Sequence, residues 1–167
     1  MELCPRVDCY LEQPVTLSYT RHQINREYTP DFIVRLLTGE CILVEVKNYE
    51  GMVDARVHRR MEALIEYCET HGFGLLLTNG THSVNRIRNY PYRTEIEAGL
   101  LELFKNRDNR TIWLHEFKAL MTQYNAKKIE FWAIVLKNSW AYYPMPFRLS
   151  RYSPYTIFRK KILDRLP

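Results

Sequence analysis

The sequence lacks a long apolar run and a paired cysteine motif, and these absences narrow the class of protein. No stretch is apolar for long enough to cross a bilayer. The N-terminal MELCPRVDCY has no basic region followed by an apolar one, so no secretory signal is predicted. We therefore expect a cytoplasmic protein whose four cysteines are thiols. Cys4 and Cys9 form no CxxC pair and have no second ligand pair, which favours free thiols over a zinc site.

Composition sets broad limits without deciding the function. The 167 residues suit one compact domain, or a small domain with an appendage, and the 46% of hydrophobic residues can form a real core. Lysine and arginine number 24 against 19 acids, a net charge of +5. This mild surplus fits a nucleic-acid partner and equally an ordinary globular protein. Internal repeats and low-complexity tracts are missing.

The N-terminal part of the chain has the residue pattern of an α/β unit. Three strands joined as an antiparallel meander are predicted at residues 15–21, 26–37 and 41–48. A helix is expected to begin after Asp54 and to end before Gly72, because apolar residues recur there at helical spacing. The apolar segment 74–78 then predicts a buried strand.

The C-terminal part is expected to be mainly helical, and we place a domain boundary near Pro91. Residues 83–88 are predicted as a loop or short helix. Further helices are expected at about 94–106, 111–124, 127–137 and 156–166, with an extended stretch at about 140–151.

One group of residues suggests chemistry. Alternation along a strand puts Glu45 and Lys47 on one face and Ile42, Val44 and Val46 on the other, which we expect to face the core. Asp31, directly after Pro30, would lie level with Glu45 across the turn at residues 38–40. Two carboxylates suit Mg²⁺, and a nearby lysine can orient water for phosphodiester hydrolysis.

The alternative is an ordinary amphipathic strand with Glu45 and Lys47 facing solvent. Triplets of the form Glu-x-Lys are common, and alone they favour that interpretation. The Pro30-Asp31 pair on the preceding strand shifts the balance toward function, because a proline that removes a ladder hydrogen bond suits the opening between strands that a metal and a phosphate need.

The same residues carry a family resemblance. Leu11-Glu12-Gln13-Pro14-Val15, Tyr28-Thr29-Pro30-Asp31-Phe32 and Val44-Glu45-Val46-Lys47 resemble the TnsA family of the PD-(D/E)XK nuclease superfamily. TnsA proteins are the strand-cutting endonuclease subunits of certain bacterial cut-and-paste transposons. The specific motifs lie in about the first eighty residues.

The resemblance implies a fold and an activity. The expected fold is a PD-(D/E)XK, restriction-endonuclease-like core at residues 1–90, with a mixed sheet flanked by helices. A small, mainly helical, winged-helix-like domain at residues 91–167 would follow. The implied activity is strand cleavage at transposon ends by a Mg²⁺-dependent DNA endonuclease, with Mn²⁺ as a substitute and a transposase as partner. Asp31 and Glu45 would bind the metal, Lys47 would assist the attacking water, and Gln13 would support the site.

The pattern departs from the superfamily at one point. Such nucleases usually carry another acid on a helix before the first strand, and here Glu2 is the main candidate, with Asp8 and Glu12 as weaker ones. A phage or repair nuclease of the same fold, which would share the chemistry but not the transposase partner, stays an alternative. So does a degenerate, non-cleaving protein that binds DNA or serves a structural role.

Basic residues in two regions are candidates for DNA contact. Arg56, Arg59 and Arg60 lie on one predicted helix, where a solvated helix face is an equally good interpretation. The C-terminal tail mixes basic and aromatic residues, which favours contact with a nucleic-acid backbone over a merely solvated tail; a protein partner could use the same surface. The basic residues of the tail singled out here are Arg151, Arg159, Lys160 and Lys161.

Overall fold

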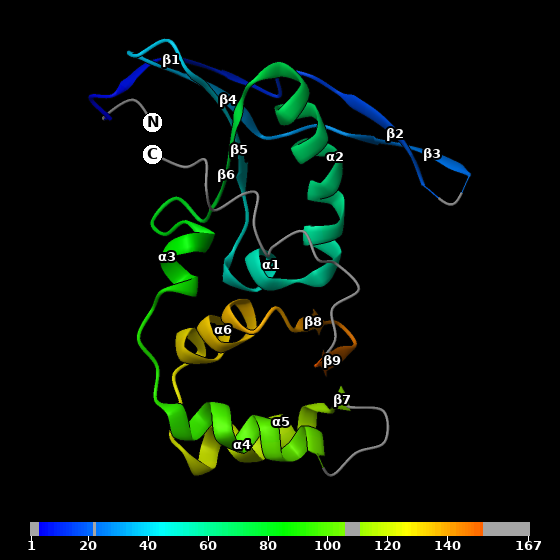
Figure 1. Cartoon of the computed structure of the whole chain (residues 1–167), viewed down its shortest axis with the longest axis vertical. Coiled ribbons are helices and arrows are strands. Elements are labelled where there is room, and N and C mark those ends of the chain that lie inside the picture. The colour runs from blue at the N-terminus through cyan, green and yellow to red at the C-terminus, as the bar shows by residue number, and fades with distance from the viewer. Residues whose placement is uncertain (1–3, 22, 106–110, 152–167) are drawn as a thin grey trace.

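A computed structural model describes residues 4–21, 23–105 and 111–151 of the chain (Figure 1). The architecture is mixed α/β, with a mixed sheet flanked by helices, as predicted at that level. The N-terminal part contains β1 (Val7–Glu12), β2 (Leu17–Arg21), β3 (Ile24–Tyr28), β4 (Phe32–Leu36), β5 (Cys41–Val46), α1 (Tyr49–Val53), α2 (Ala55–His71), β6 (Gly74–Thr78) and α3 (Val84–Arg88). The C-terminal part contains α4 (Thr94–Lys105), β7 (Thr111–Ile112), α5 (Leu114–Gln123), α6 (Lys128–Lys137), β8 (Ala141–Pro144) and β9 (Phe147–Ser150).

The central sheet has the strand order β1-β4-β5-β6. β4 pairs antiparallel with both β1 and β5, whereas β6 pairs parallel with β5. A parallel pair needs a crossover connection, which α1 and α2 provide. Figure 1 shows α2 running alongside the sheet, so the helix covers one of its faces.

The predicted three-stranded meander is wrong in one respect. The segment 26–37 is not a single strand but two, β3 and β4, which belong to different sheets. β3 pairs only with β2, and β4 lies between β1 and β5. Pro30, buried between them, cannot donate a ladder hydrogen bond, so pairing breaks there and the chain changes sheet.

Strand β1 was not predicted from the sequence. Five of its six residues are exposed, so they show no apolar alternation. The strand forms because its backbone pairs with the outer edge of β4, from Val7 opposite Leu36 to Glu12 opposite Phe32.

Helix α2 begins and ends where the sequence predicts, after Asp54 and before Gly72. The side chain of Asp54 accepts a hydrogen bond from the backbone N–H of Arg56 at 2.8 Å, as an N-cap does. Gly72 has φ +69°, a left-handed conformation that glycine adopts without steric cost. The short α1 just before it was not predicted; Asn48 caps it by accepting from the N–H of Gly51.

The C-terminal part combines three helices with a small sheet of order β7-β9-β8. The predicted helix over residues 111–124 begins later, at Leu114, because Thr111 and Ile112 pair with β9 instead. The stretch expected to be extended is the β8–β9 hairpin. The helix expected at about 156–166 lies outside the described residues.

Helix α6 packs against both parts of the chain. Its residues 130–136 are all buried, and the ring of Trp132 stacks on Tyr49 of α1 with centroids 4.9 Å apart. A single apolar cluster accordingly includes Leu43 and Met61 of the N-terminal part together with Phe131 and Leu149 of the C-terminal part. Figure 1 shows α6 between the sheet-bearing part above and the α4–α5 pair below.

Among the helices of the described ranges, none combines the length and the apolar character that a membrane span requires.

Burial of His58 predicts a loss of stability in mild acid. Burial lowers the pKa of His58 from 6.5 to about 4, while the Met52 carbonyl, 2.6 Å from Nε2, acts in the opposite direction. Below pH 6.5 His58 therefore binds a proton in the unfolded chain but stays neutral in the folded chain. The free energy of unfolding should decrease as the pH is lowered from 6.5 to 4. From pH 7.5 to 5 we expect a loss of about 2 kcal/mol from this group, measured by urea unfolding.

The matched variants are His58→Gln, which keeps a side-chain donor, and His71→Gln at an exposed histidine. The first should flatten the pH dependence and the second should preserve it. An equal drop between pH 7.5 and 5 in the wild type and in His58→Gln would contradict the assignment.

Candidate functional site

Asp31, Glu45 and Lys47 converge at one end of the central sheet. The ammonium of Lys47 contacts Glu45 Oε1 directly and lies 3.6 Å from Asp31 Oδ2. Asp31 Oδ2 also accepts a hydrogen bond from the backbone N–H of Val46 at 2.7 Å. The side chains that the sequence analysis singled out are therefore brought together, with the lysine between the two carboxylates.

Strand register explains this convergence. In the β4–β5 ladder Phe32 lies opposite Val44 and Ile33 opposite Leu43, so Asp31, one residue before β4, is level with Glu45. The backbone on the other side is held as well, because the N–H of Gln13 donates to the carbonyl of Asp31 at 2.9 Å. Gln13, with φ +46°, thus contacts the loop that carries Asp31 through its backbone.

Glu45 is buried rather than solvent-facing. Only 2% of its side chain is exposed, against 38% for the side chain of Asp31 and 30% for that of Lys47. Glu45 Oε2 has no hydrogen-bond partner among the described residues. A buried carboxylate oxygen without a partner is costly, so this atom is one that a bound cation or water would satisfy.

The expectation about which face of β5 meets the core is only partly right: Val44 is 4% exposed, as expected, but the face of Glu45 is buried too. Leu43, on the same face as Glu45, is fully buried and belongs to the apolar cluster with Met61 and Leu64 of α2. Val46, on the opposite face, is 39% exposed. Alternation assigned the residues to faces correctly but could not tell which face α2 would cover.

Tyr28 is a site neighbour that the sequence analysis did not single out as functional. Burial together with the adjacent Glu45 and Asp31 carboxylates raises the pKa of Tyr28 above its ordinary value of 10, while the Arg60 guanidinium acts in the opposite direction. The hydroxyl therefore stays protonated and can donate toward Glu45. The signal was available in the sequence, since Tyr28 belongs to the same short motif as Asp31.

A third acid does not join the pair in the described part of the chain. Glu2 lies outside the described residues. Asp8 is bound to Arg35, with Oδ2 2.6 Å from the guanidinium, and Glu12 lies opposite Phe32, on the sheet face away from Glu45. The ranges described hold no group of three or more His, Cys, Asp or Glu residues arranged for a metal ion.

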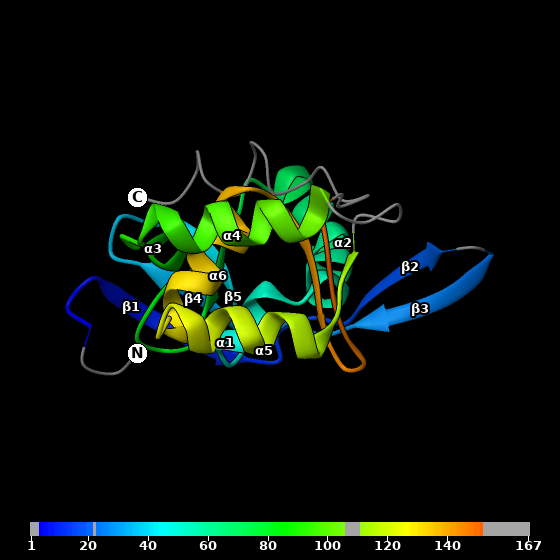
Figure 2. The ribbon, with the colours of Figure 1, turned by 90° about the horizontal axis from the view of Figure 1, so that it is seen from below.

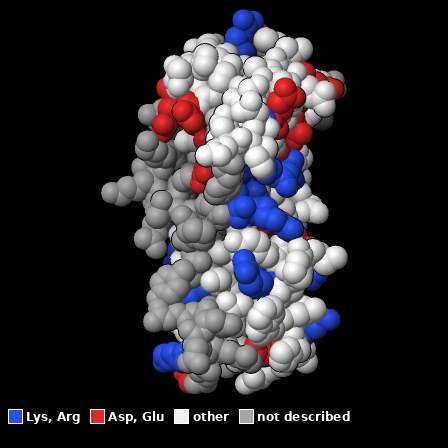
Figure 3. Space-filling model, turned by 90° about the vertical axis from the view of Figure 1, so that its right-hand side faces the viewer, with Lys and Arg blue, Asp and Glu red and all other residues white. Residues whose placement is uncertain are grey.

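The three arginines of α2 differ in their surroundings. Arg56 is bound to Asp54, with 2.7 Å between Nη2 and Oδ2, and donates to the Met145 carbonyl at 2.9 Å. The side chain of Arg59 is partly buried, whereas Arg60 is exposed and lies near Tyr28. In Figure 3, which views the molecule from the right-hand side of Figure 1, lysine and arginine side chains gather across the middle of the visible face.

Of the basic tail residues, only Arg151 is described, and it is exposed. Arg159, Lys160 and Lys161 lie outside the described residues, so their predicted role stays a prediction.

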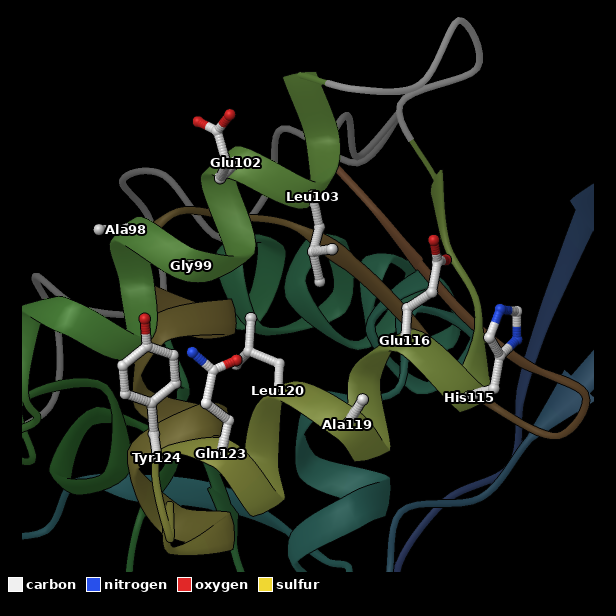
Figure 4. Close-up of a pocket in the computed structure, with 10 residues that line it drawn as sticks. All are labelled: Ala98, Gly99, Glu102, Leu103, His115, Glu116, Ala119, Leu120, Gln123 and Tyr124. Atoms are coloured by element: carbon white, nitrogen blue, oxygen red, sulfur yellow. The ribbon is translucent and has the colours of Figure 1, made fainter.

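A groove between α4 and α5 is separate from this site. Small and apolar residues line much of it, among them Gly99, Leu103, Ala119 and Leu120 (Figure 4). A Cβ atom at Gly99 would meet Leu120 Cδ1 at 2.9 Å, so the glycine permits the close approach of the two helices. None of the predicted site residues lines the groove.

Comparison with known proteins agrees with the motifs around the site. No curated protein and no solved structure matches the chain. Residues 4–79 match the family model described as TnsA-like endonuclease N terminal. This range begins just before β1 and ends just after β6, so it contains Asp31, Glu45, Lys47 and the whole central sheet. The N-terminal part of the chain therefore belongs to the TnsA-like endonuclease family.

Proposed function

We propose that this protein is a metal-dependent DNA endonuclease with Asp31, Glu45 and Lys47 as its reaction centre. The observation that carries the proposal is the convergence of two carboxylates and one ammonium, with Glu45 Oε2 buried and without a partner in the described structure. The family of residues 4–79 supports DNA as the substrate and a transposase as the general kind of partner. Strand cleavage during transposition is the biological role proposed.

The donor set fits Mg²⁺, and Mn²⁺ as a substitute. Mg²⁺ is usually held by one or two carboxylates, with water and phosphate oxygens completing its shell. Asp31 and Glu45 would hold the ion, which when bound supplies positive charge to the phosphate and lowers the pKa of a water. Because both residues are anchored to paired strands, their positions are set before the substrate binds.

Lys47 has a separate role in this proposal. Its ammonium lies between the carboxylates and 3.0 Å from the Val46 carbonyl, so it is fixed at the mouth of the site. From there it can donate a hydrogen bond to the attacking water and offset the negative charge that develops on the phosphate. Tyr28, which faces Glu45 from β3, would orient that carboxylate.

We further propose that residues 1–90 form a PD-(D/E)XK core and residues 91–167 a winged-helix-like domain. In support, the C-terminal elements follow the order helix, strand, two helices and a β-hairpin, and the first strand pairs with the last. This is the order of a helix-turn-helix unit followed by a wing.

Removing one carboxylate should abolish cleavage without unfolding the chain. Asp31→Asn keeps the shape of the side chain but weakens cation binding, so nicking of supercoiled plasmid in Mg²⁺ or Mn²⁺ should fall by at least about 100-fold. Asp8→Asn is the matched control, since it changes an exposed carboxylate paired with Arg35 on the same sheet. Cleavage that survives Asp31→Asn would remove this site assignment. A folded wild-type protein that never nicks DNA would instead favour a degenerate, binding-only protein, which the lack of a third acid in the described ranges also allows.

The Tyr28 hydroxyl should affect cleavage through Glu45. Tyr28→Phe keeps the ring and removes the hydroxyl beside Glu45, and we expect a roughly tenfold slower nicking rate, the size of effect typical of losing a polar group next to a charged one. The Mg²⁺ concentration for half-maximal rate should rise as well, which a purely structural role would not cause. Tyr19→Phe, on the paired strand β2, is the control. Unchanged Mg²⁺ dependence in Tyr28→Phe would contradict a positioning role.

A further inference from the structure

The β2–β3 ribbon is built unlike the rest of the described structure. The two strands pair with each other, from Leu17 opposite Tyr28 to Arg21 opposite Ile24, and join no other sheet. Figures 1 and 2 show the ribbon projecting well beyond the body of the protein. A two-stranded ribbon is marginally stable alone in water, so a projecting one suggests a bound partner.

Only the root of the ribbon is anchored. Leu17 is buried in the apolar cluster, Tyr28 packs against it, and the hydroxyls of Thr16 and Thr29 lie 2.8 Å apart. Beyond the root most of the described side chains are exposed, and apart from Ile24, which is 55% exposed, the exposed ones are polar. Those with exposed hydrogen-bonding or charged groups are Ser18, Thr20, Gln23, Asn25, Arg26 and Glu27. This mixture of donors and acceptors, with one cation (Arg26) and one anion (Glu27), suits the base edges of a groove better than an apolar protein surface, and Arg26 suits a phosphate.

The root of the ribbon lies at the reaction centre. Tyr28 ends β3 next to Glu45, and Asp31 follows three residues later. Arg60 of α2 lies near Tyr28. Within the described residues neither Arg26 nor Arg60 forms an ion pair, in contrast to Arg56 with its bond to Asp54. Two arginine side chains are therefore available beside a centre proposed to hold a phosphate.

The reach of the ribbon matches a DNA groove. Five residues of β3 span about 16 Å at strand spacing, which corresponds to about five base-pair steps from the proposed scissile phosphate. The major groove is wide enough for a two-stranded β-ribbon.

Helix α6 is not a candidate for entering the DNA groove. It is the third helix of the C-terminal part, but its residues 130–136 are buried between the two parts of the chain. A helix covered on all sides cannot enter a groove without the two parts separating.

We infer that the β2–β3 ribbon lies in the major groove of the DNA duplex beside the cleavage point, with Arg26 and Arg60 on phosphates. Asn25 and Thr20, whose side chains are joined by a 2.9 Å hydrogen bond, would face the groove at the outer part of the ribbon. This inference rests on the proposed function, because it places the ribbon relative to the scissile phosphate.

The test is duplex binding by Arg26→Ala, with Lys118→Ala on α5 as a control at an exposed cation of the far part of the chain. Affinity for a labelled duplex of about 30 base pairs, measured by anisotropy in Ca²⁺ over a range of salt, should fall by roughly fivefold in Arg26→Ala. The slope of log affinity against log salt should become shallower by about one. Lys118→Ala should match the wild type in affinity, in salt slope and in cleavage rate.

The outcomes separate this inference from the proposed function. Wild-type affinity and salt slope in Arg26→Ala would overturn the ribbon assignment, even if Asp31→Asn abolishes cleavage. Weaker binding by Arg26→Ala in a protein that never cleaves would support the ribbon as a DNA arm and contradict the nuclease proposal. A change in oligomeric state of Arg26→Ala with unchanged DNA affinity would assign the ribbon to a second copy of the chain, and so would also overturn it.

Discussion

Burying the carboxylate of Glu45, near the end of β5, costs free energy, and the rest of the site is arranged around this buried group. Glu45 is almost fully buried, one of its oxygens contacts Lys47, and the other has no partner in the described structure. A charge in such a place destabilises the fold unless something compensates it. Lys47 compensates in part, and Asp31 adds a second negative charge 3.6 Å from the same ammonium. Two carboxylates sharing one lysine leave net negative charge, which is the condition that attracts a divalent cation.

The surrounding structure holds these groups rigidly. Asp31 is held on one side by the N–H of Val46 and on the other, through its carbonyl, by the N–H of Gln13. Lys47 is held by its backbone N–H, which donates to the carbonyl of Thr78 at 2.8 Å and so continues the pairing of β5 with β6. Every residue of the site is therefore attached to the ladder of the central sheet, so the carboxylates need little rearrangement on binding a substrate.

The C-terminal part is joined to this sheet by apolar packing rather than by a flexible linker alone. Trp132 of α6 stacks on Tyr49, and the hydroxyl of Tyr49 lies 2.9 Å from His82 Nδ1. Arg93, just before α4, binds Glu130 through two 2.9 Å hydrogen bonds, and this pairing lowers the pKa of Glu130 to about 2. Because residues 130–136 of α6 are buried between the parts, this helix is part of the core that joins them.

The sequence alone determined which residues meet at the site, because strand alternation and ladder register are local properties. Glu45 and Lys47 share a face for that reason, and Asp31 follows from the length of the β4–β5 turn. The local sequence pattern likewise predicted helix α2, with its caps at Asp54 and Gly72, and strand β6. Only the tertiary structure decided that the Glu45 face of β5 is buried, that β1 pairs with β4, and that the chain leaves one sheet for another at Pro30. These features depend on contacts between segments distant in sequence, which no local pattern records; the exposed residues of β1 form a strand through such pairing with β4.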